Sequence, residues 1–172
     1  MSDHYSEFVQ SSVGRKIAQN LGLPLPTTLE RFKEGQAPIT GRVIFGSSLN
    51  GALAGSIAKI LANTQAQVFM DAAQSASAAL TQAHISASAF TAEQTYKVAI
   101  FDASGIQSAD DLKQVYTFFH PIARSIEKSG RVVVLGLPPE QCQSIAQAAA
   151  QRALEGFVKS VAKEFKRGIT DR

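Results

Sequence analysis

Four short apolar runs, each followed by a segment of helical character, constrain the fold of this chain more than any other feature. The runs are residues 42–45 (RVIF), 66–70 (AQVFM), 96–101 (YKVAIF) and 131–135 (RVVVL). Runs this short and this apolar are typical of parallel strands that are buried on both faces of a sheet. Strands that alternate with helices predict an α/β fold, a doubly wound parallel sheet of about four strands with helices on both faces.

A helix is expected after each of these runs. The expected ranges are residues 52–62, 72–93, 108–128 and 140–166. We expect Ser108 to cap the third helix and Pro121 to kink it, because proline lacks the backbone N–H that a helix interior needs. Gly168 should end the fourth helix, and residues 169–172 are too few to form another strand.

About 40 residues precede the first apolar run. Phe8, Val9, Val13, Ile17 and Leu21 recur near the 3.6-residue period, which predicts one helix over residues 2–21. The two prolines in residues 23–26 (LPLP) require extended backbone. The chain therefore divides into an N-terminal helix with an extended linker, residues 1–41, and an α/β domain, residues 42–172. We expect the extension to lie across that domain or along a partner.

Composition argues against several classes of function. The 172 residues are 45% apolar, which suits one domain with a substantial core. The formal net charge of +3, with acidic residues among the basic ones, argues against binding to nucleic acid. No apolar run approaches the roughly 18–20 residues of a membrane-spanning helix, and the polar start of the chain (MSDHYSEF) does not resemble a signal peptide.

The chain has one cysteine, Cys142, and three scattered histidines. A single cysteine excludes an internal disulfide and fits a reducing cytoplasm. A metal site is not expected, because zinc sites need three or four ligands that converge. We therefore expect a soluble protein of the cytoplasm.

A glycine-containing loop, Gly46-Ser47-Ser48-Leu49-Asn50-Gly51, follows the first apolar run. A strand, a glycine loop and a helix in this order can hold a phosphate group at the helix N-terminus. The loop does not match G-x-G-x-x-G, and it lacks the Gly-Lys-Ser/Thr of a P-loop. The pattern favours a simple strand-to-helix turn. A residual phosphate or flavin site stays open, because Ser47, Ser48 and Asn50 could still donate hydrogen bonds.

The third and fourth expected helices have wide apolar stripes. The stripe residues that we assign to a candidate interface are Val115, Phe118, Phe119, Ile122, Leu154, Phe157, Val158 and Val161. A stripe of this width indicates either deep core or a subunit interface, and the sequence does not separate the two.

Residues 151–165 (QRALEGFVKSVAKEF) resemble the helix of short-chain dehydrogenases/reductases that holds a Tyr-x-x-x-Lys pair. The matching residues are Ala153, Leu154, Gly156, Ser160, Ala162 and Glu164. In this register the family's lysine falls on Gln151, its tyrosine on Gln147 and its serine on Leu137, or on Gly136 with an offset of one. The family's Asn-Asn-Ala-Gly element falls on residues 101–105, where the asparagines are missing.

The whole chain resembles the N-terminal half of the high-molecular-weight β-ketoacyl-acyl carrier protein reductases, the long FabG type. The similar blocks, in order, are LGLPLPTTLERF, GRVIFG, VAIFDASGI, FFHPIARSI, GRVVVLG and QRALEGFVKSVAKEFKRG. This resemblance implies a degenerate flavodoxin-like or Rossmann-like three-layer domain that precedes a complete catalytic domain in a dimeric protein. It also implies that the domain's last strand would start just beyond Arg172.

Glutamine cannot replace the family's catalytic pair, because a carboxamide does not ionise and is no general acid. None of Tyr5, Tyr96 and Tyr116 is followed four residues later by lysine. We therefore expect a non-catalytic structural domain without a cofactor of its own. The resemblance implies that the parent enzyme reduces 3-oxoacyl thioesters with NADH or NADPH, and that partners are its catalytic domain and a second copy. The alternative is a nucleotide-, flavin- or coenzyme A-binding regulatory module that uses the loop from Gly46 to Gly51.

Overall fold

The computed structural model describes residues 4–23, 25, 30, 33–37, 39–70, 76–165 and 168–171. The chain forms two compact units, Met1–Arg31 and Phe32–Arg172.

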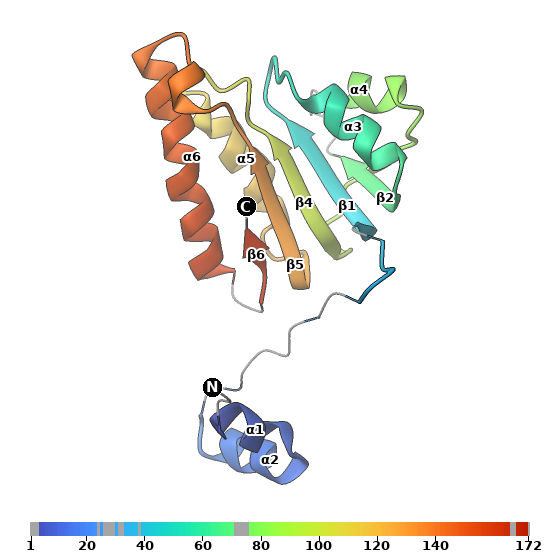
Figure 1. The fold of residues 1–172 in the computed structure, drawn as a ribbon, viewed down its shortest axis with the longest axis vertical. Coiled ribbons are helices and arrows are strands. Elements are labelled where there is room, and N and C mark those ends of the chain that lie inside the picture. Colours follow the sequence, from blue (N-terminus) through green and yellow to red (C-terminus); the bar gives the residue numbers. More distant parts are fainter. Residues whose placement is uncertain are drawn as a thin grey trace. The chain divides into compact units, whose positions relative to one another are not determined.

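The larger unit is built on one six-stranded sheet in which every strand pairing is parallel (Figure 1). Its strands are β1 (Thr40–Ser47), β2 (Gln65–Met70), β3 (Ser88–Ala89), β4 (Tyr96–Asp102), β5 (Ile126–Leu135) and β6 (Thr170–Asp171). The spatial order is β3-β2-β1-β4-β5-β6, so the direction of winding reverses between β1 and β4. This order is that of a doubly wound dinucleotide-binding sheet, and the predicted fold class is confirmed.

Helices cover both faces of this sheet. They are α3 (Ala54–Ala62), α4 (Ser77–Gln82), α5 (Leu112–Ile122) and α6 (Ile145–Glu164), with a 3₁₀ turn, η1 (Pro139–Gln141), before α6. Buried side chains of α3 and α4 form one apolar cluster with the sheet, and those of α5 and α6 form another. The unit therefore has three layers, with the sheet in the middle.

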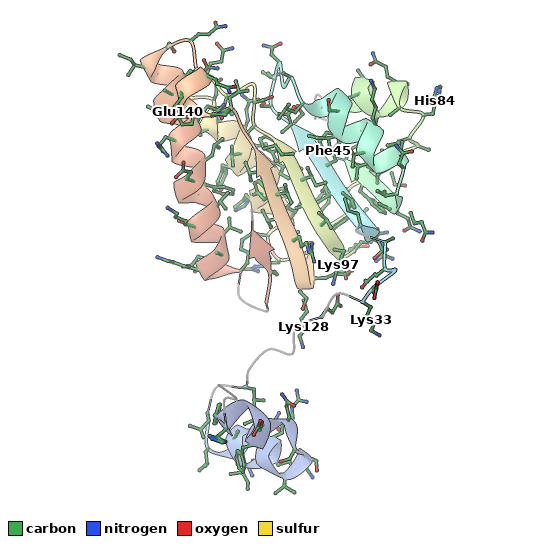
Figure 2. All side chains as sticks on the ribbon, viewed as in Figure 1. Lys33, Phe45, His84, Lys97, Lys128 and Glu140 are labelled. Carbon is green, nitrogen blue, oxygen red and sulfur yellow. The ribbon has the colours of Figure 1, made fainter. Side chains whose placement is uncertain are left out.

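Alternation along the central strands explains why the sequence shows them as unbroken apolar runs. On β4, Ala99 and Phe101 belong to the cluster with α5 and α6, whereas Val98 and Ile100 belong to the cluster with α3 and α4. Phe45 of β1, labelled in Figure 2, is fully buried in the second cluster. Because both faces are covered, both of these sets of side chains are apolar.

The sheet has six strands, where the sequence predicted about four. Both additional strands, β3 and β6, are two residues long and lie at the edges. Thr170 pairs with Arg131 of β5, so the prediction that residues 169–172 are too few for a strand is wrong. The segment predicted as a helix over residues 72–93 forms only α4 and then β3, and its residues 72–75 lie outside the described part.

Helix α5 is shorter than predicted at both ends. It begins at Leu112, because Asp111 folds back and accepts hydrogen bonds from the backbone N–H groups of Gln107 and Ser108 in a preceding turn, each at 3.0 Å. It ends at Ile122, one residue after Pro121. The expected kink is therefore a helix end, and Ile126 begins a strand.

The N-terminal unit contains two helices, α1 (His4–Gln10) and α2 (Ser12–Asn20), where the sequence predicted one. Ser11 separates them with extended backbone, and its Oγ accepts the N–H of Gly14 at 3.0 Å as the cap of α2. A Cβ on Gly14 would overlap the carbonyl group of Phe8, so glycine permits this close turn. Of the predicted stripe Val9 is buried, whereas Phe8, Val13, Ile17 and Leu21 are exposed. Ala18, which the stripe did not include, is also buried.

Candidate functional site

Four buried polar residues lie where β1 and β4 end, at the point where the strand order reverses. They are Ser47, Ser48, Asp102 and Ser104. Open α/β folds bind ligands in the crevice at this position, next to the N-terminus of the helix that follows β1, here α3. A nucleotide site of the kind found in this fold would therefore lie at these residues.

Asp102 is the centre of this group. Its side chain is completely buried, and its Oδ1 accepts the Ser104 N–H at 3.0 Å and the Ser104 hydroxyl at 2.6 Å. Its Oδ2 accepts the N–H of Leu53, the residue preceding α3, at 3.0 Å. It also accepts the Ser47 hydroxyl at 3.4 Å, which shares its one hydrogen with the Ser48 carbonyl at 3.1 Å. All four contacts come from donors, which matches an ionised carboxylate, a group that only accepts.

The loop between β1 and α3 is closed over Asp102. Ser48 Oγ donates to the Asp102 carbonyl at 2.9 Å and accepts the Gly105 N–H at 3.0 Å. The Ala52 N–H donates to Ser104 Oγ at 2.8 Å. The hydroxyls of Ser47 and Ser48, proposed from the sequence as donors to a phosphate, thus bind the chain itself.

Close packing explains the glycine at the end of this loop. A Cβ on Gly51 would overlap Ser47 Oγ and the Asp102 carboxylate. Asn50 adopts left-handed backbone, with φ of 59°, a conformation that asparagine tolerates better than most residues. Gly46 pairs with Phe101 inside the β1–β4 ladder. Gly51 is therefore required by close packing, and Gly46 is part of the sheet.

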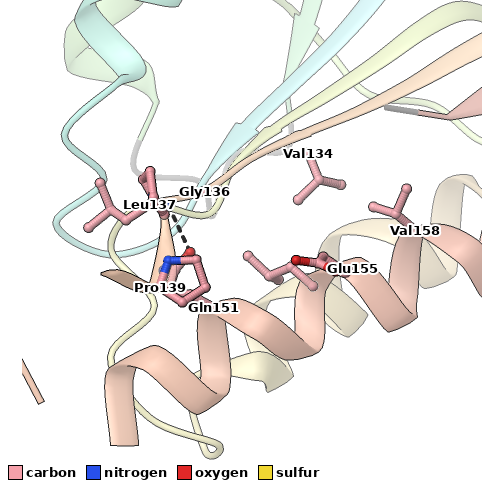
Figure 3. Close-up of a pocket in the computed structure, with 9 residues that line it drawn as sticks. Val134, Gly136, Leu137, Pro139, Gln151, Glu155 and Val158 are labelled. Atoms are coloured by element: carbon pink, nitrogen blue, oxygen red, sulfur yellow. Dashed lines mark hydrogen bonds between the residues drawn. The ribbon is translucent and has the colours of Figure 1, made fainter. Parts of the chain in front are cut away.

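Gln151 occupies the position that the resemblance assigns to the catalytic lysine. It is only 4% exposed, and its Oε1 accepts the Leu137 N–H at 2.9 Å (Figure 3). Its Nε2 donates to the carbonyl oxygens of Ala103 and Ile106, each at 2.9 Å. One amide thereby joins the loop after β4, the loop after β5 and helix α6.

Gln147 occupies the position assigned to the catalytic tyrosine, and it helps to start α6. Its N–H donates to Oγ of Ser144, the N-cap residue, at 3.1 Å. Its Oε1 accepts the N–H of Gln143 at 2.8 Å. This Ser-x-x-Gln arrangement is close to a capping box, with the glutamine reaching one residue further back.

An open groove of about 320 Å³ lies between the loop after β5 and helix α6 (Figure 3). It is lined by Val134, Gly136, Leu137, Pro138, Pro139, Gln151, Leu154, Glu155 and Val158. Among these lining residues Glu155 is the one with an acidic or basic side chain, and it forms an ion pair with Arg152 at 2.6 Å. Apart from the Glu155 carboxylate, the lining residues offer no side chain that could act as a nucleophile, and none of them has a phenol for proton transfer to a carbonyl oxygen.

The candidate interface residues are mostly core. Val115, Phe118, Phe119, Ile122, Leu154 and Val161 are at most 6% exposed and belong to the cluster that α5 and α6 form with the sheet. Only Phe157 and Val158 are partly exposed. The assignment of the six buried side chains to an interface is corrected, because their apolar surface already packs within the unit.

Among the residues that the structure describes, no group of three or more histidine, cysteine, aspartate or glutamate side chains is arranged to hold a metal ion. His84 is exposed and follows the C-terminal end of α4 (Figure 2). Within the same described ranges, no helix combines the length and the apolar character needed to cross a membrane.

The sequence did not indicate the role of Asp102. In the sequence this residue directly follows the apolar run 96–101, and it falls within residues 101–105, which align with the Asn-Asn-Ala-Gly element of the similar family. The available signal was an acidic residue directly after a buried strand at the point of strand reversal. Ser104 is a near neighbour, but the other two partners, Ser47 and Leu53, lie about 50 residues away along the chain, so spacing could not reveal them.

The strand order and the two helical layers define the class of fold, a Rossmann-like α/β sandwich. No family model and no curated protein matches the chain. Among solved structures the same fold is found in BdcA in complex with NADPH, at 20% identity and a TM-score of 0.53, covering 77% of this chain and 68% of that one.

Two further solved structures have the same fold. One is a dehydrogenase/reductase from Sinorhizobium meliloti, at 20% identity and a TM-score of 0.55, covering 77% of this chain and 70% of that one. The other is a short-chain dehydrogenase/reductase from Serratia marcescens, also at 20% identity and 0.55, covering 78% and 73%. At these identities the similarity establishes the fold.

Proposed function

We propose that this chain is a non-catalytic structural and interaction domain of a longer β-ketoacyl-acyl carrier protein reductase. The parent enzyme reduces 3-oxoacyl thioesters of acyl carrier protein or coenzyme A in fatty acid metabolism, with NADH or NADPH bound in a separate catalytic domain. The order of sequence blocks similar to that family supports the parent enzyme. The buried hydrogen bonds of Gln151 support the absence of catalysis in this domain, and they are the observation on which the proposal depends.

Gln151 supports this proposal because its side chain is part of the fold. A reductase of this class uses an ammonium group to lower the pKa of a catalytic phenol. Gln151 supplies no charge, and its amide is held by three backbone partners. Gln147 supplies no phenol, and Leu137 offers only its backbone N–H, which is bound to Gln151.

The closed loop after β1 supports the absence of a cofactor in this domain. A dinucleotide needs free N–H groups where its pyrophosphate meets the helix N-terminus. Here the Leu53 N–H is bound by Asp102 and the Ala52 N–H is bound by Ser104. The module that binds nucleotide, flavin or coenzyme A through Gly46–Gly51 is thereby disfavoured, and the binding experiment below separates it.

The proposed contact with a second copy or with the catalytic domain uses the exposed sides of α5 and α6. Tyr116 of α5 is 61% exposed and stacks on His120, with ring centroids 4.8 Å apart. On α6, a Cβ at Gly156 would meet no atom within 4 Å. We place the protein in the cytoplasm, where Cys142 stays a free thiol.

Ligand binding is tested first, by titration of the chain with NADH, NADPH, FMN and coenzyme A in a calorimeter. The proposal expects no saturable binding and no oxidation of NADPH with a 3-oxoacyl thioester. Stoichiometric binding of any of the four would favour the regulatory module instead.

Association is tested by sedimentation velocity over a range of protein concentrations. We expect the chain to self-associate, and Tyr116→Asp to shift the equilibrium toward monomer while the circular dichroism spectrum stays unchanged. Ile60→Asp is the matched control, because Ile60 is 60% exposed on α3, on the opposite face of the sheet. A wild-type chain that stays monomeric at every concentration, alone or mixed with a catalytic domain, contradicts the interaction role.

A further inference from the structure

We infer that the Asp102 carboxylate is an internal anion that occupies the place of a bound phosphate at the start of α3. The inference extends the proposed function, since it names what fills the ligand position of the fold. It depends on the contacts of Asp102 and is independent of any catalytic domain.

The position is one that favours negative charge. Asp102 Oδ2 accepts the N–H of Leu53, directly before the nine-residue helix α3. Unpaired N–H groups and the helix dipole concentrate positive potential at such a helix start, where phosphates commonly bind. In this fold a dinucleotide places its pyrophosphate there. The carboxylate thus stands where an external anion would otherwise stand.

The surroundings of the carboxylate resemble a built anion site. Two backbone N–H groups, of Leu53 and Ser104, and two hydroxyls, of Ser47 and Ser104, converge on its two oxygens. These groups come from the end of β1, the start of α3 and the turn after β4. A buried anion is tolerated only when it is hydrogen-bonded in this way.

Close packing then excludes an external anion. A Cβ on Gly105 would overlap the carbonyl oxygen of Leu49, so the turn after β4 lies directly against the loop after β1. Ser48 bridges the two segments, with bonds to the Asp102 carbonyl and the Gly105 N–H. Removal of the Asp102 side-chain carboxylate should therefore leave converging donors around a space that suits a small carboxylate.

The test is chemical rescue of Asp102→Ala. The thermal unfolding midpoint of this variant should lie below that of the wild type, and it should rise saturably with formate, by at least about 2 °C. Formamide, a neutral molecule of the same size, should not produce this rise. The wild type and Asp110→Ala, which loses an exposed carboxylate, give the general effect of each additive on the midpoint, and neither should show the saturable rise with formate.

An Asp102→Ala midpoint that rises no more with formate than with formamide overturns the inference. If this variant does not fold, a long-range HNCO spectrum of the wild type tests the inference instead. A coupling between the Leu53 amide nitrogen and the Asp102 side-chain carboxyl carbon supports the inference, and its absence contradicts it. These outcomes are separate from the proposed function, which fails instead if the wild type binds a dinucleotide or neither self-associates nor binds a catalytic domain.

Discussion

The side chain of Gln151 reaches the backbone of Leu137, fourteen residues earlier in the chain, and its Oε1 accepts the Leu137 N–H at 2.9 Å. The same amide donates through Nε2 to Ala103 and Ile106 in the turn after β4. A lysine ammonium has three donors and no acceptor, so it could not bind the Leu137 N–H. Glutamine at this position therefore suits the fold of the two loops.

Gln151→Leu should destabilise the chain. The apolar side chain fills a similar volume but leaves the Leu137 N–H and the carbonyl groups of Ala103 and Ile106 without their partner. A buried group that loses its hydrogen bond costs about 1–3 kcal/mol, so we expect a loss of about 2–4 kcal/mol in the free energy of unfolding, because the loops can relax in part. Urea unfolding followed by circular dichroism measures this loss.

Gln82→Leu is the control for this change. Gln82 lies at the end of α4 and is exposed, so its replacement should change the free energy of unfolding by no more than about 0.5 kcal/mol. Equal effects of the two substitutions would show that the Gln151 hydrogen bonds do not stabilise the loops.

Two glycines should respond to alanine in opposite directions. A Cβ at Gly156, inside α6, meets no atom within 4 Å, so Gly156→Ala should stabilise the chain by about 0.5–1 kcal/mol through lower entropy of the unfolded state. A Cβ at Gly105 would overlap the Leu49 carbonyl, so Gly105→Ala should destabilise it by about 1–3 kcal/mol. Thermal unfolding of both variants beside the wild type checks the signs. A stabilising Gly105→Ala would show that the two loops are not tightly packed.

The sequence predicted the central strands because their burial on both faces leaves an unbroken apolar run. It missed β3 and β6, since two residues have no period and pair only because a neighbouring strand is there. Contacts between residues far apart along the chain could not be predicted from the sequence either. The bonds of Asp102 to Ser47 and Leu53 depend on the order of strands in the sheet, which no local pattern contains.

The sequence correctly predicted that the helices of the core exist, but it predicted their first and last residues less well. Residues such as Phe118 and Leu154 gave the correct periodic stripe, but periodicity does not distinguish a core face from an interface. In the structure Phe118 and Leu154 are both buried in the core. The start of α5 was misplaced because Ser108 caps a turn, where its hydroxyl donates to Asp111 at 3.0 Å. At residues 2–21 the break at Ser11 was hidden, because serine is also compatible with a helix interior.

Ser144→Ala should weaken the start of α6. Its Oγ accepts the N–H of Gln147, and loss of an N-cap of this kind costs about 1 kcal/mol. Ser160→Ala in the same helix is the matched control, since Ser160 is exposed and its hydroxyl only donates back to the Gly156 carbonyl. The control should be neutral or slightly stabilising, because alanine is the better helix former. Hydrogen exchange at the first turn of α6 locates the effect, and unchanged protection in Ser144→Ala would contradict the capping role.

The turn before α5 should make stability depend on pH through Asp111. Hydrogen bonds from the Gln107 backbone and the Ser108 side chain hold the pKa of Asp111 below its ordinary value of 3.8. A carboxyl group whose pKa is lower in the folded state stabilises the fold above its unfolded pKa, and this contribution disappears as the pH falls through the folded value. The difference in unfolding free energy between wild type and Asp111→Asn should therefore be constant above about pH 5.5 and shrink below about pH 4. Urea titrations at several pH values measure it, and Ser108→Ala, which removes one donor, should make the change smaller. A difference that stays constant down to about pH 2.5 would mean that the turn does not bind the carboxylate.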